Sequence, residues 1–373
     1  MSRRWLPIVG LLVLLFIVVA FFHWRRKERA SIRYMVAAFP TAVVADSKGN
    51  LFVAANKQNR ILEVSAARRV MIVAGNGTVG FGGDDGPANQ ASLDAPVSIA
   101  LDAADNLFIA DTTNNRVRRV DAKTHIITTV AGNGADFMNG EVGKVATATG
   151  VYQPISIAID GDENIYIGEA ASPGIKRVDS LTHIVSKVIG AGLPGDPSAS
   201  EPAAGPFWVA VDERGALFYS DPSRNTVSQV NLPQNDVYII AGSAVCGFEG
   251  DGGSARGALL CFPEALSVRS DKGLYIADTG NNRIRRVDLN NGAITTVAGN
   301  GKTGYSGDGG AAVNASLNGP MGTTVDAKGN LYIADTGNNC IRRVETGTGR
   351  ISTWATDRDL ESPSSGDQEK GRP

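Results

Sequence analysis

Short apolar runs separated by Asp, Asn and Gly turns recur along this chain. In the clearest copy they are Val97–Leu101, Leu107–Ala110, Arg116–Val120 and Ile126–Ala131. Runs of this length, rich in Val and Ile and bounded by turn residues, are typical of β-strands. The repeats contain no long pattern with the helical period of about 3.6 residues. The pattern therefore predicts an all-β domain.

The four-run unit occurs six times, and its copies begin 52 to 58 residues apart. The starts are Pro40, Pro96, Pro154, Pro206, Pro263 and Pro320. A regular period of this size indicates units that bury their apolar faces only against one another. The second run is apolar on both faces, so we expect each sheet to be covered on both sides. We predict a six-bladed β-propeller of four-stranded blades. A β-solenoid is the alternative, but its rungs are shorter and lack hairpin turns.

The sixth copy shows the repeat pattern in full. Its marks are Pro320, Asp326, Gly329-Asn330, Asp335, Asn338-Asn339 and Arg342-Arg343. This pattern resembles the NHL repeat, and the resemblance covers about Pro40 to Thr356. The resemblance implies the propeller fold. It does not imply one function, because NHL-type propellers serve many roles.

An uncharged apolar segment, Leu6–Phe22, precedes the repeats. At ~1.5 Å per residue it spans about 26 Å as a helix, slightly less than a bilayer core. A cleaved signal peptide is the alternative, but the segment ends in bulky residues rather than a small-residue cleavage site. We therefore predict a membrane anchor with a basic flank over 1–32, the propeller over 33–360 and a disordered tail over 361–373. Either Ile351–Ala355 or Tyr34–Ala38 supplies the last strand of the ring.

Cysteine placement bears on the compartment. Cys246 and Cys261 bracket one insert between repeats, which predicts a disulfide and an oxidising environment. Basic residues on both sides of the apolar segment give opposing signals for its orientation. We expect a single-pass membrane protein whose propeller is periplasmic or extracellular. Cys340 has no predicted role.

Inserts separate the fourth run of one copy from the first run of the next. They are Gly75–Ala95, Gly132–Gln153, Gly190–Gly205, Gly242–Phe262 and Gly299–Gly319. In a four-stranded antiparallel blade these connections leave from the same face as the turns between strands two and three. We therefore predict one loop-decorated face and one plain face, with binding on the decorated face.

The sequence offers little catalytic chemistry. His125 and His183 fall in turns between strands three and four, too far from the ring axis to share a metal ion with other ligands. A Gly-Asp-Gly-Gly phrase in three inserts, with Asp85 at its third position in the first copy, is compatible with calcium, but its one or two carboxylates favour a simple turn. We predict no catalytic or metal-binding residue and no cofactor, with calcium as the weaker alternative. Glu264 is the exceptional acidic residue on a predicted inner strand.

The prediction of function depends on the residues that differ between copies of the repeat. The net charge of −2 and the acidic inserts argue against nucleic-acid binding. Copies one, three and four diverge most, so candidate ligand-binding residues are Lys57, Glu169, Phe207, Trp208 and Arg224. We predict a monomeric, membrane-anchored scaffold that binds a protein, peptide or glycan through the decorated face. The alternative is a propeller-type hydrolase or lactonase that uses a divalent metal on the axis.

Overall fold

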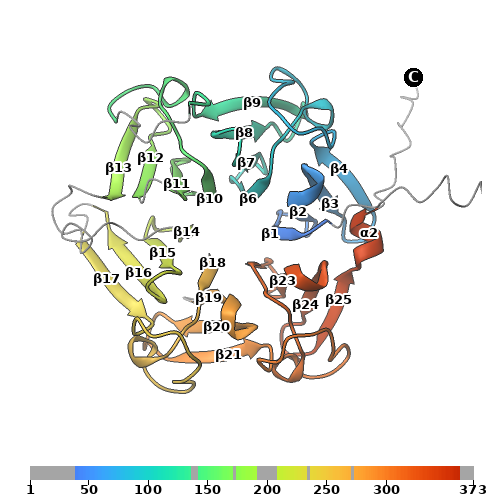
Figure 1. Ribbon diagram of the computed structural model, residues 1–373, viewed down its shortest axis with the longest axis vertical. Coiled ribbons are helices and arrows are strands. Elements are labelled where there is room, and N and C mark those ends of the chain that lie inside the picture. The colour runs from blue at the N-terminus through green and yellow to red at the C-terminus, as the bar shows by residue number, and fades with distance from the viewer. Residues whose placement is uncertain are drawn as a thin grey trace, which may run out of the picture. The chain divides into compact units, whose positions relative to one another are not determined.

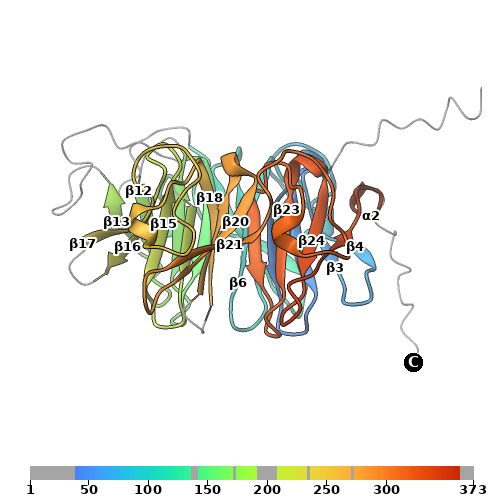
Figure 2. The same ribbon diagram turned by 90° about the horizontal axis from the view of Figure 1, so that it is seen from below.

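The computed structural model describes residues 38–135, 142–170, 174–190, 208–232, 236–269 and 273–361. These residues form a ring of six antiparallel sheets (Figures 1 and 2). The predicted six-bladed propeller is confirmed. The helices within these ranges are single short turns, and none has the length and hydropathy of a membrane span. The predicted anchor, Leu6–Phe22, lies outside the described residues.

Each blade uses four consecutive strands, ordered from the ring axis to the rim. Blade 1 has β1 (Pro40–Ala45), β2 (Leu51–Ala55), β3 (Arg60–Val64) and β4 (Val70–Ala74); blade 2 has β6 (Pro96–Leu101), β7 (Leu107–Asp111), β8 (Arg116–Val120) and β9 (Ile126–Ala131). Blade 3 has β10 (Pro154–Ile159), β11 (Ile165–Glu169), β12 (Gly174–Val178) and β13 (Val185–Gly190); blade 4 has β14 (Trp208–Val211), β15 (Leu217–Asp221), β16 (Thr226–Asn231) and β17 (Asp236–Ala241). Blade 5 has β18 (Pro263–Val268), β19 (Gly273–Asp278), β20 (Arg283–Asp288) and β21 (Ile294–Ala298); blade 6 has β22 (Gly322–Val325), β23 (Leu331–Asp335), β24 (Cys340–Val344) and β25 (Ile351–Ala355).

Short elements connect strands within blades and link one blade to the next. The insert before blade 2 adds a two-residue strand, β5 (Gly86–Pro87), to the outer edge of that blade. Single 3-10 turns are η1 (Asn56–Gln58), η2 (Ala88–Gln90), η3 (Ala146–Ala148), η4 (Ala255–Gly257), η5 (Thr279–Asn281), η6 (Ala312–Asn314) and η7 (Thr336–Asn338). One α-helical turn, α2 (Asp357–Glu361), follows the last strand.

Apolar side chains gather between blades rather than within one blade. One cluster joins Ala54 and Ile61 of blade 1 to Ile99 and Ile109 of blade 2. The second strand of a blade, such as β7, is buried along its whole length because blades cover both of its faces. A single repeat could not bury this surface alone, which explains the regular period in the sequence.

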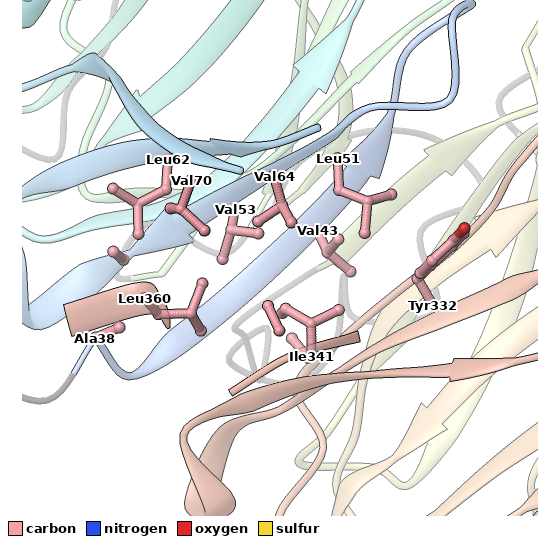
Figure 3. Packing of buried hydrophobic residues seen from close by; sticks show 13 residues of the cluster. Ala38, Val43, Leu51, Val53, Leu62, Val64, Val70, Tyr332, Ile341 and Leu360 are labelled. Carbon is pink, nitrogen blue, oxygen red and sulfur yellow. The ribbon is translucent and has the colours of Figure 1, made fainter. Parts of the chain in front are cut away.

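The ring closes between blade 6 and blade 1. Ile351–Ala355 forms β25 and completes blade 6, so the first of the two predicted closures is confirmed. Figure 3 shows the apolar cluster at this seam, where Val53 and Leu62 of blade 1 pack with Ile341 of blade 6 and Leu360 of α2. Within the described residues no strand is exchanged between blades 6 and 1, so side chains and a few hydrogen bonds hold the seam.

The inserts differ from the prediction that they would stay on one face. Strong twist turns the outer strands β9, β21 and β25 along the rim (Figure 1). The insert between blades 1 and 2 therefore crosses the rim, where the Ala88 N–H donates to the carbonyl of His125 at 2.9 Å. The Ala88 carbonyl accepts from Gly75 N–H at 2.9 Å. One alanine thus clips the end of β4 to the turn before β9.

The same clip recurs at three other junctions. The alanines are Ala146, Ala255 and Ala312, and the turn residues that accept from them are His183, Gly292 and Gly349. These turns were predicted to belong to the plain face. These four inserts therefore begin and end on the face of the turns between strands two and three, but each ties two blades together at the rim.

Candidate functional site

A narrow channel runs along the ring axis. Its cavity volume is about 230 Å³, and its walls come from the inner strands β1, β6, β10, β14, β18 and β22. The described residues that line it are small or apolar, with hydroxyls but no charged side chain. Such a cavity suits a slender ligand that carries few polar groups.

Trp208 breaks the symmetry of the channel wall. The equivalent residues of the other inner strands are Ala42, Ser98, Ser156, Ala265 and Gly322. Trp208 lies in the wall with 5% of its surface exposed. It is thus an aromatic residue at a level of the wall where the other five inner strands carry small ones.

Glu264 breaks the symmetry one residue earlier on the inner strands. It lies on β18 directly before Ala265, which lines the channel. Its Oε2 atom is buried and has no hydrogen-bond partner among the described residues. Burial raises the pKa of this carboxyl from 4.5 to about 7. A buried polar atom without a partner is rare and indicates a site for a water, an ion or a ligand.

A buried network of two carboxylates and one arginine explains the repeated Asp and Arg residues. In blade 2 the fully buried Arg118 contacts Asp111 at 3.3 Å and Asp84 of the insert at 2.6 Å. Burial is the main cause that raises the pKa of Asp111 to about 6, and Asn114 and Arg118 oppose it. Blades 5 and 6 repeat this network with Arg285, Asp278 and Asp251, and with Arg342, Asp335 and Asp308.

The network also accounts for the Gly-Asp-Gly-Gly phrase. Its aspartates Asp84, Asp251 and Asp308 bind arginines, and the phrase leads into the turns η2, η4 and η6. Among the residues that the structure describes, no group of three or more His, Cys, Asp or Glu side chains could hold a metal ion. His125 and His183 lie exposed in the outer turns.

The second asparagine of the repeat joins neighbouring blades. Asn115 has a left-handed backbone with φ of 53°, and its Oδ1 accepts from the Gln153 N–H at 2.8 Å. The equivalent acceptors are Asn59, Asn225, Asn282 and Asn339. The repeat residues are therefore engaged in holding the ring.

Three predicted ligand residues lie away from the channel. Glu169 is buried, and its Oε1 binds Lys176 Nζ at 2.8 Å, a pair that replaces the Asp–Arg pair in blade 3. Arg224 lies 3.8 Å from Asp221 in blade 4, where Ser228 replaces the buried arginine. Lys57 is exposed, and its Nζ lies 4.3 Å from the centre of the Phe39 ring.

Of the predicted ligand residues, the structure thus places Trp208 at the channel. Phe207 lies outside the described residues. The sequence prediction missed Ser267 and Thr323, two hydroxyl residues of the channel wall. Alignment of the six inner strands could have found them, because Ser267 stands where blades 2, 3 and 4 have alanine.

The predicted disulfide is confirmed. Cys246 and Cys261 are joined across 15 residues within the insert that precedes blade 5. The Cys261 N–H donates to Asp278 Oδ1 at 2.8 Å, so the bridge is tied to the buried network of that blade. Gly280 packs so closely that a Cβ there would lie 2.9 Å from the Cys261 sulfur. Cys340 is buried and lies outside this bridge.

Comparison with known proteins agrees with the repeat pattern. Residues 292–369 match the Teneurin NHL domain model. Protein SUPPRESSOR OF QUENCHING 1, chloroplastic, of Arabidopsis thaliana is 26% identical over 85% of this chain and 31% of its own length. NHL repeat-containing protein 2 of Gallus gallus is 25% identical over 84% of this chain and 47% of its own length. The chain thus spans less than half the length of these relatives.

A solved structure shows the same fold at lower identity. An auxiliary nutrient binding protein from Bacteroides thetaiotaomicron has a TM-score of 0.61. It is 16% identical, and the match covers 86% of this chain and 70% of that protein. This likeness concerns the fold alone. The family model over 292–369, the relatives and the six repeats agree in their similarity to NHL-repeat proteins, and the chain folds as a six-bladed β-propeller.

Proposed function

We propose that this chain is a monomeric, membrane-anchored binding propeller that works outside the cytoplasm. Its partner is a protein, peptide or glycan. The partner is anchored by a group that it inserts into the channel mouth. The mouth lies on the face that carries the turns between strands two and three. The observation that carries this proposal is the break in symmetry at Trp208 and Glu264, on inner strands whose counterparts are otherwise small or apolar at these positions.

The repeated residues support the proposal because their side chains already make structural contacts within the ring. Asn115 and its equivalents bind the next blade, and Arg118 and its equivalents are buried in ion pairs. Residues that hold a scaffold together are poor candidates for recognition, because a ligand would have to displace those contacts. The Oε2 atom of Glu264 has no such contact among the described residues.

Two observations support the location. The disulfide between Cys246 and Cys261 is expected in an oxidising compartment. The uncharged segment Leu6–Phe22 has nearly the length that a membrane span needs. The nutrient-binding propeller of similar fold offers an analogy for a binding role.

A propeller-type hydrolase is the second candidate. One observation favours it: Glu264 is a buried carboxyl whose pKa of about 7 would suit general acid–base catalysis. The hydrolase predicted from the sequence uses a divalent metal on the axis, and such a metal would need ligands besides Glu264.

The test is retention of a partner by the full chain in detergent. Wild type and Trp208→Ala are immobilised and challenged with envelope proteins and glycans, with Val79→Ser on the exposed insert as control. We expect wild type and the control to retain the same partner and Trp208→Ala to lose it at least tenfold. Equal retention by Trp208→Ala would contradict the proposal. Turnover of a candidate ester or lactone that Glu264→Gln abolishes would favour the hydrolase.

A further inference from the structure

We propose that the axial channel binds an extended primary ammonium compound, with Glu264 at the mouth holding the ammonium group and the Ser267 and Thr323 hydroxyls contacting the rest of the ligand. This inference rests on the proposed function, because it names the chemistry that the same site recognises.

The first argument is a cluster of unsatisfied atoms. The Oε2 of Glu264, the Oγ of Ser267 and the Oγ1 of Thr323 are buried and have no hydrogen-bond partner among the described residues. They lie on β18 and β22, which neighbour each other and are joined by the Ala265 N–H to Met321 carbonyl bond of 3.3 Å. A buried polar atom left without a partner destabilises a protein by about 1–3 kcal/mol. Three on two neighbouring inner strands, two of them in the channel-lining residues Ser267 and Thr323, indicate that a ligand or water completes the site.

The inner strands of blades 1 to 3 show what satisfied hydroxyls look like. Ser98 Oγ accepts from the Ile157 N–H at 3.3 Å, and Ser156 Oγ accepts from the Val209 N–H at 2.8 Å. Thr41 Oγ1 donates to the Val97 carbonyl at 2.7 Å. Each of these hydroxyls links one blade to the next. The unsatisfied atoms named above lie instead on blades 5 and 6, so that sector of the channel is specialised.

The second argument is charge. Burial is the cause that raises the pKa of Glu264, and no cationic side chain opposes it. The carboxylates on the neighbouring strands are engaged elsewhere, since Asp221 accepts from Ser223 and Asp278 accepts from Asn281. Glu264 therefore lacks a protein cation among the described residues. A ligand that brings a positive charge would supply it.

The third argument is shape. Glu264 and Ser267 are three residues apart on one strand, which corresponds to roughly 10 Å. The channel of about 230 Å³ admits a narrow chain but not a bulky head group. An ammonium group carries three N–H donors on one small centre, whereas a guanidinium has five in a wide plane. Trp208 adds an aromatic face on the neighbouring strand β14, which favours an alkylammonium.

Binding should depend on pH through Glu264. The carboxyl must be ionised to pair with an ammonium, and its pKa in the free protein is about 7. Affinity should therefore rise about tenfold between pH 6 and pH 8, since the ionised fraction rises by that factor. Glu264→Gln should remove this dependence.

The experiment uses the full chain in detergent and three probes of matched length. These are 5-aminopentan-1-ol, pentylamine and pentan-1-ol, titrated at pH 8 by calorimetry and by tryptophan fluorescence. We expect 5-aminopentan-1-ol to bind at least tenfold tighter than pentan-1-ol and about threefold tighter than pentylamine. A fourth probe, Nα-acetyl-lysine N-methylamide, shows whether a lysine side chain of a partner enters as well as a free amine.

Variants separate the roles of the three side chains. Glu264→Gln should weaken 5-aminopentan-1-ol binding at least tenfold, and Ser267→Ala with Thr323→Val should remove its advantage over pentylamine. Thr41→Val is the matched control, because its hydroxyl donates to the Val97 carbonyl of the next blade and Thr41 does not line the channel, and binding should persist. Circular dichroism checks that each variant is folded.

Two outcomes would overturn the inference. One is equal binding of the amine and the alcohol by wild type, and the other is unchanged amine binding by Glu264→Gln. If Glu264→Gln still retains a macromolecular partner while no amine binds wild type, the ammonium site fails and the binding scaffold stands. If Trp208→Ala also retains that partner, the proposed function itself fails.

Discussion

Blades 1 and 2 fill the same buried position in opposite ways. In blade 2 the position holds Asp111 at the end of β7 and Arg118 on β8, both with 0% exposure. In blade 1 the equivalent residues are Ala55 and Leu62, also with 0% exposure. Apolar packing alone therefore builds a blade. The ion network is not required for the fold, in agreement with the general finding that buried pairs can be replaced by apolar residues.

The surroundings of the two positions explain the difference. In blade 2 the arginine also binds Asp84, so the network fixes the insert that crosses the rim. In blade 1, Leu62 instead packs in a cluster with Leu360 of α2 (Figure 3). The comparison teaches that the buried arginine positions an insert, while the blade core depends on apolar contact.

The largest effect is expected when the buried arginine of the blade 2 network is removed and its aspartate is kept. Arg118→Leu should destabilise the protein by about 3–5 kcal/mol, because Asp111 would remain buried without its cation. Urea unfolding at pH 7 measures this. Arg118→Leu combined with Asp111→Ala copies blade 1 and should recover most of the loss. A double variant as unstable as the single one would refute the equivalence of the two blades.

The next effect concerns the disulfide, which distinguishes blade 5 from the other blades that contain the ion network. Blades 2, 5 and 6 share the network, but the insert of blade 5 also carries the disulfide. Replacing Cys246 and Cys261 by serine should cost about 3 kcal/mol, as expected for a closed loop of about 15 residues. Proteolysis should then cut the blade 5 insert before the matching insert of blade 6. Cys340→Ser should not reproduce this pattern.

A third effect compares the inner strand of blade 5 with those of the other blades. Because burial raises the pKa of Glu264 from 4.5 to about 7, the folded state binds the proton more tightly than the unfolded state. The stability that this adds is complete below pH 4.5 and is lost as pH rises to about 7. Glu264→Gln should therefore be more stable than wild type by about 3 kcal/mol at pH 8 and similar at pH 4. Parallel pH profiles for the two proteins would contradict the assignment.

The smallest effect concerns the rim. Phe81 of the blade 2 insert lies over Arg116, with 3.8 Å between the guanidinium carbon and the ring centre. Phe81→Ala should cost about 0.5–1 kcal/mol, because the contact is partly exposed. Phe81→Leu should lose less, since it keeps apolar surface over the guanidinium. Thermal unfolding distinguishes the two variants, and a loss above about 2 kcal/mol would mean that the ring does more than this contact.

The fold could be predicted from sequence because the repeat records it directly. The four runs of the second copy agree with β6 to β9 to within one residue at each end. The path of the inserts could not be predicted in the same way. It depends on the twist that turns β9 along the rim, and twist accumulates across strands that no local pattern describes.

The candidate site shows a different limit. Comparison of the six repeats identified Trp208, which lies at the channel, as a residue that departs from the repeat. The same comparison also selected Glu169, which lies elsewhere. The change at Glu169 is compensated by Lys176, so the pair keeps a charge contact of 2.8 Å within the blade. A linear sequence cannot distinguish such a compensated exchange from a ligand contact, because the partner lies on the next strand.

The seam between blades 6 and 1 has a consequence for how the chain acquires its structure. Its hydrogen bonds join residues about 300 positions apart, such as Phe39 to Asn339 and Gln58 to Leu360. Contacts elsewhere in the ring link adjacent repeats and can form as each repeat leaves the ribosome. Closure must wait for residue 360, so five junctions can assemble while blade 1 still exposes one apolar face. Until synthesis ends, that face is the surface on which a chaperone would act or a second chain would wrongly associate.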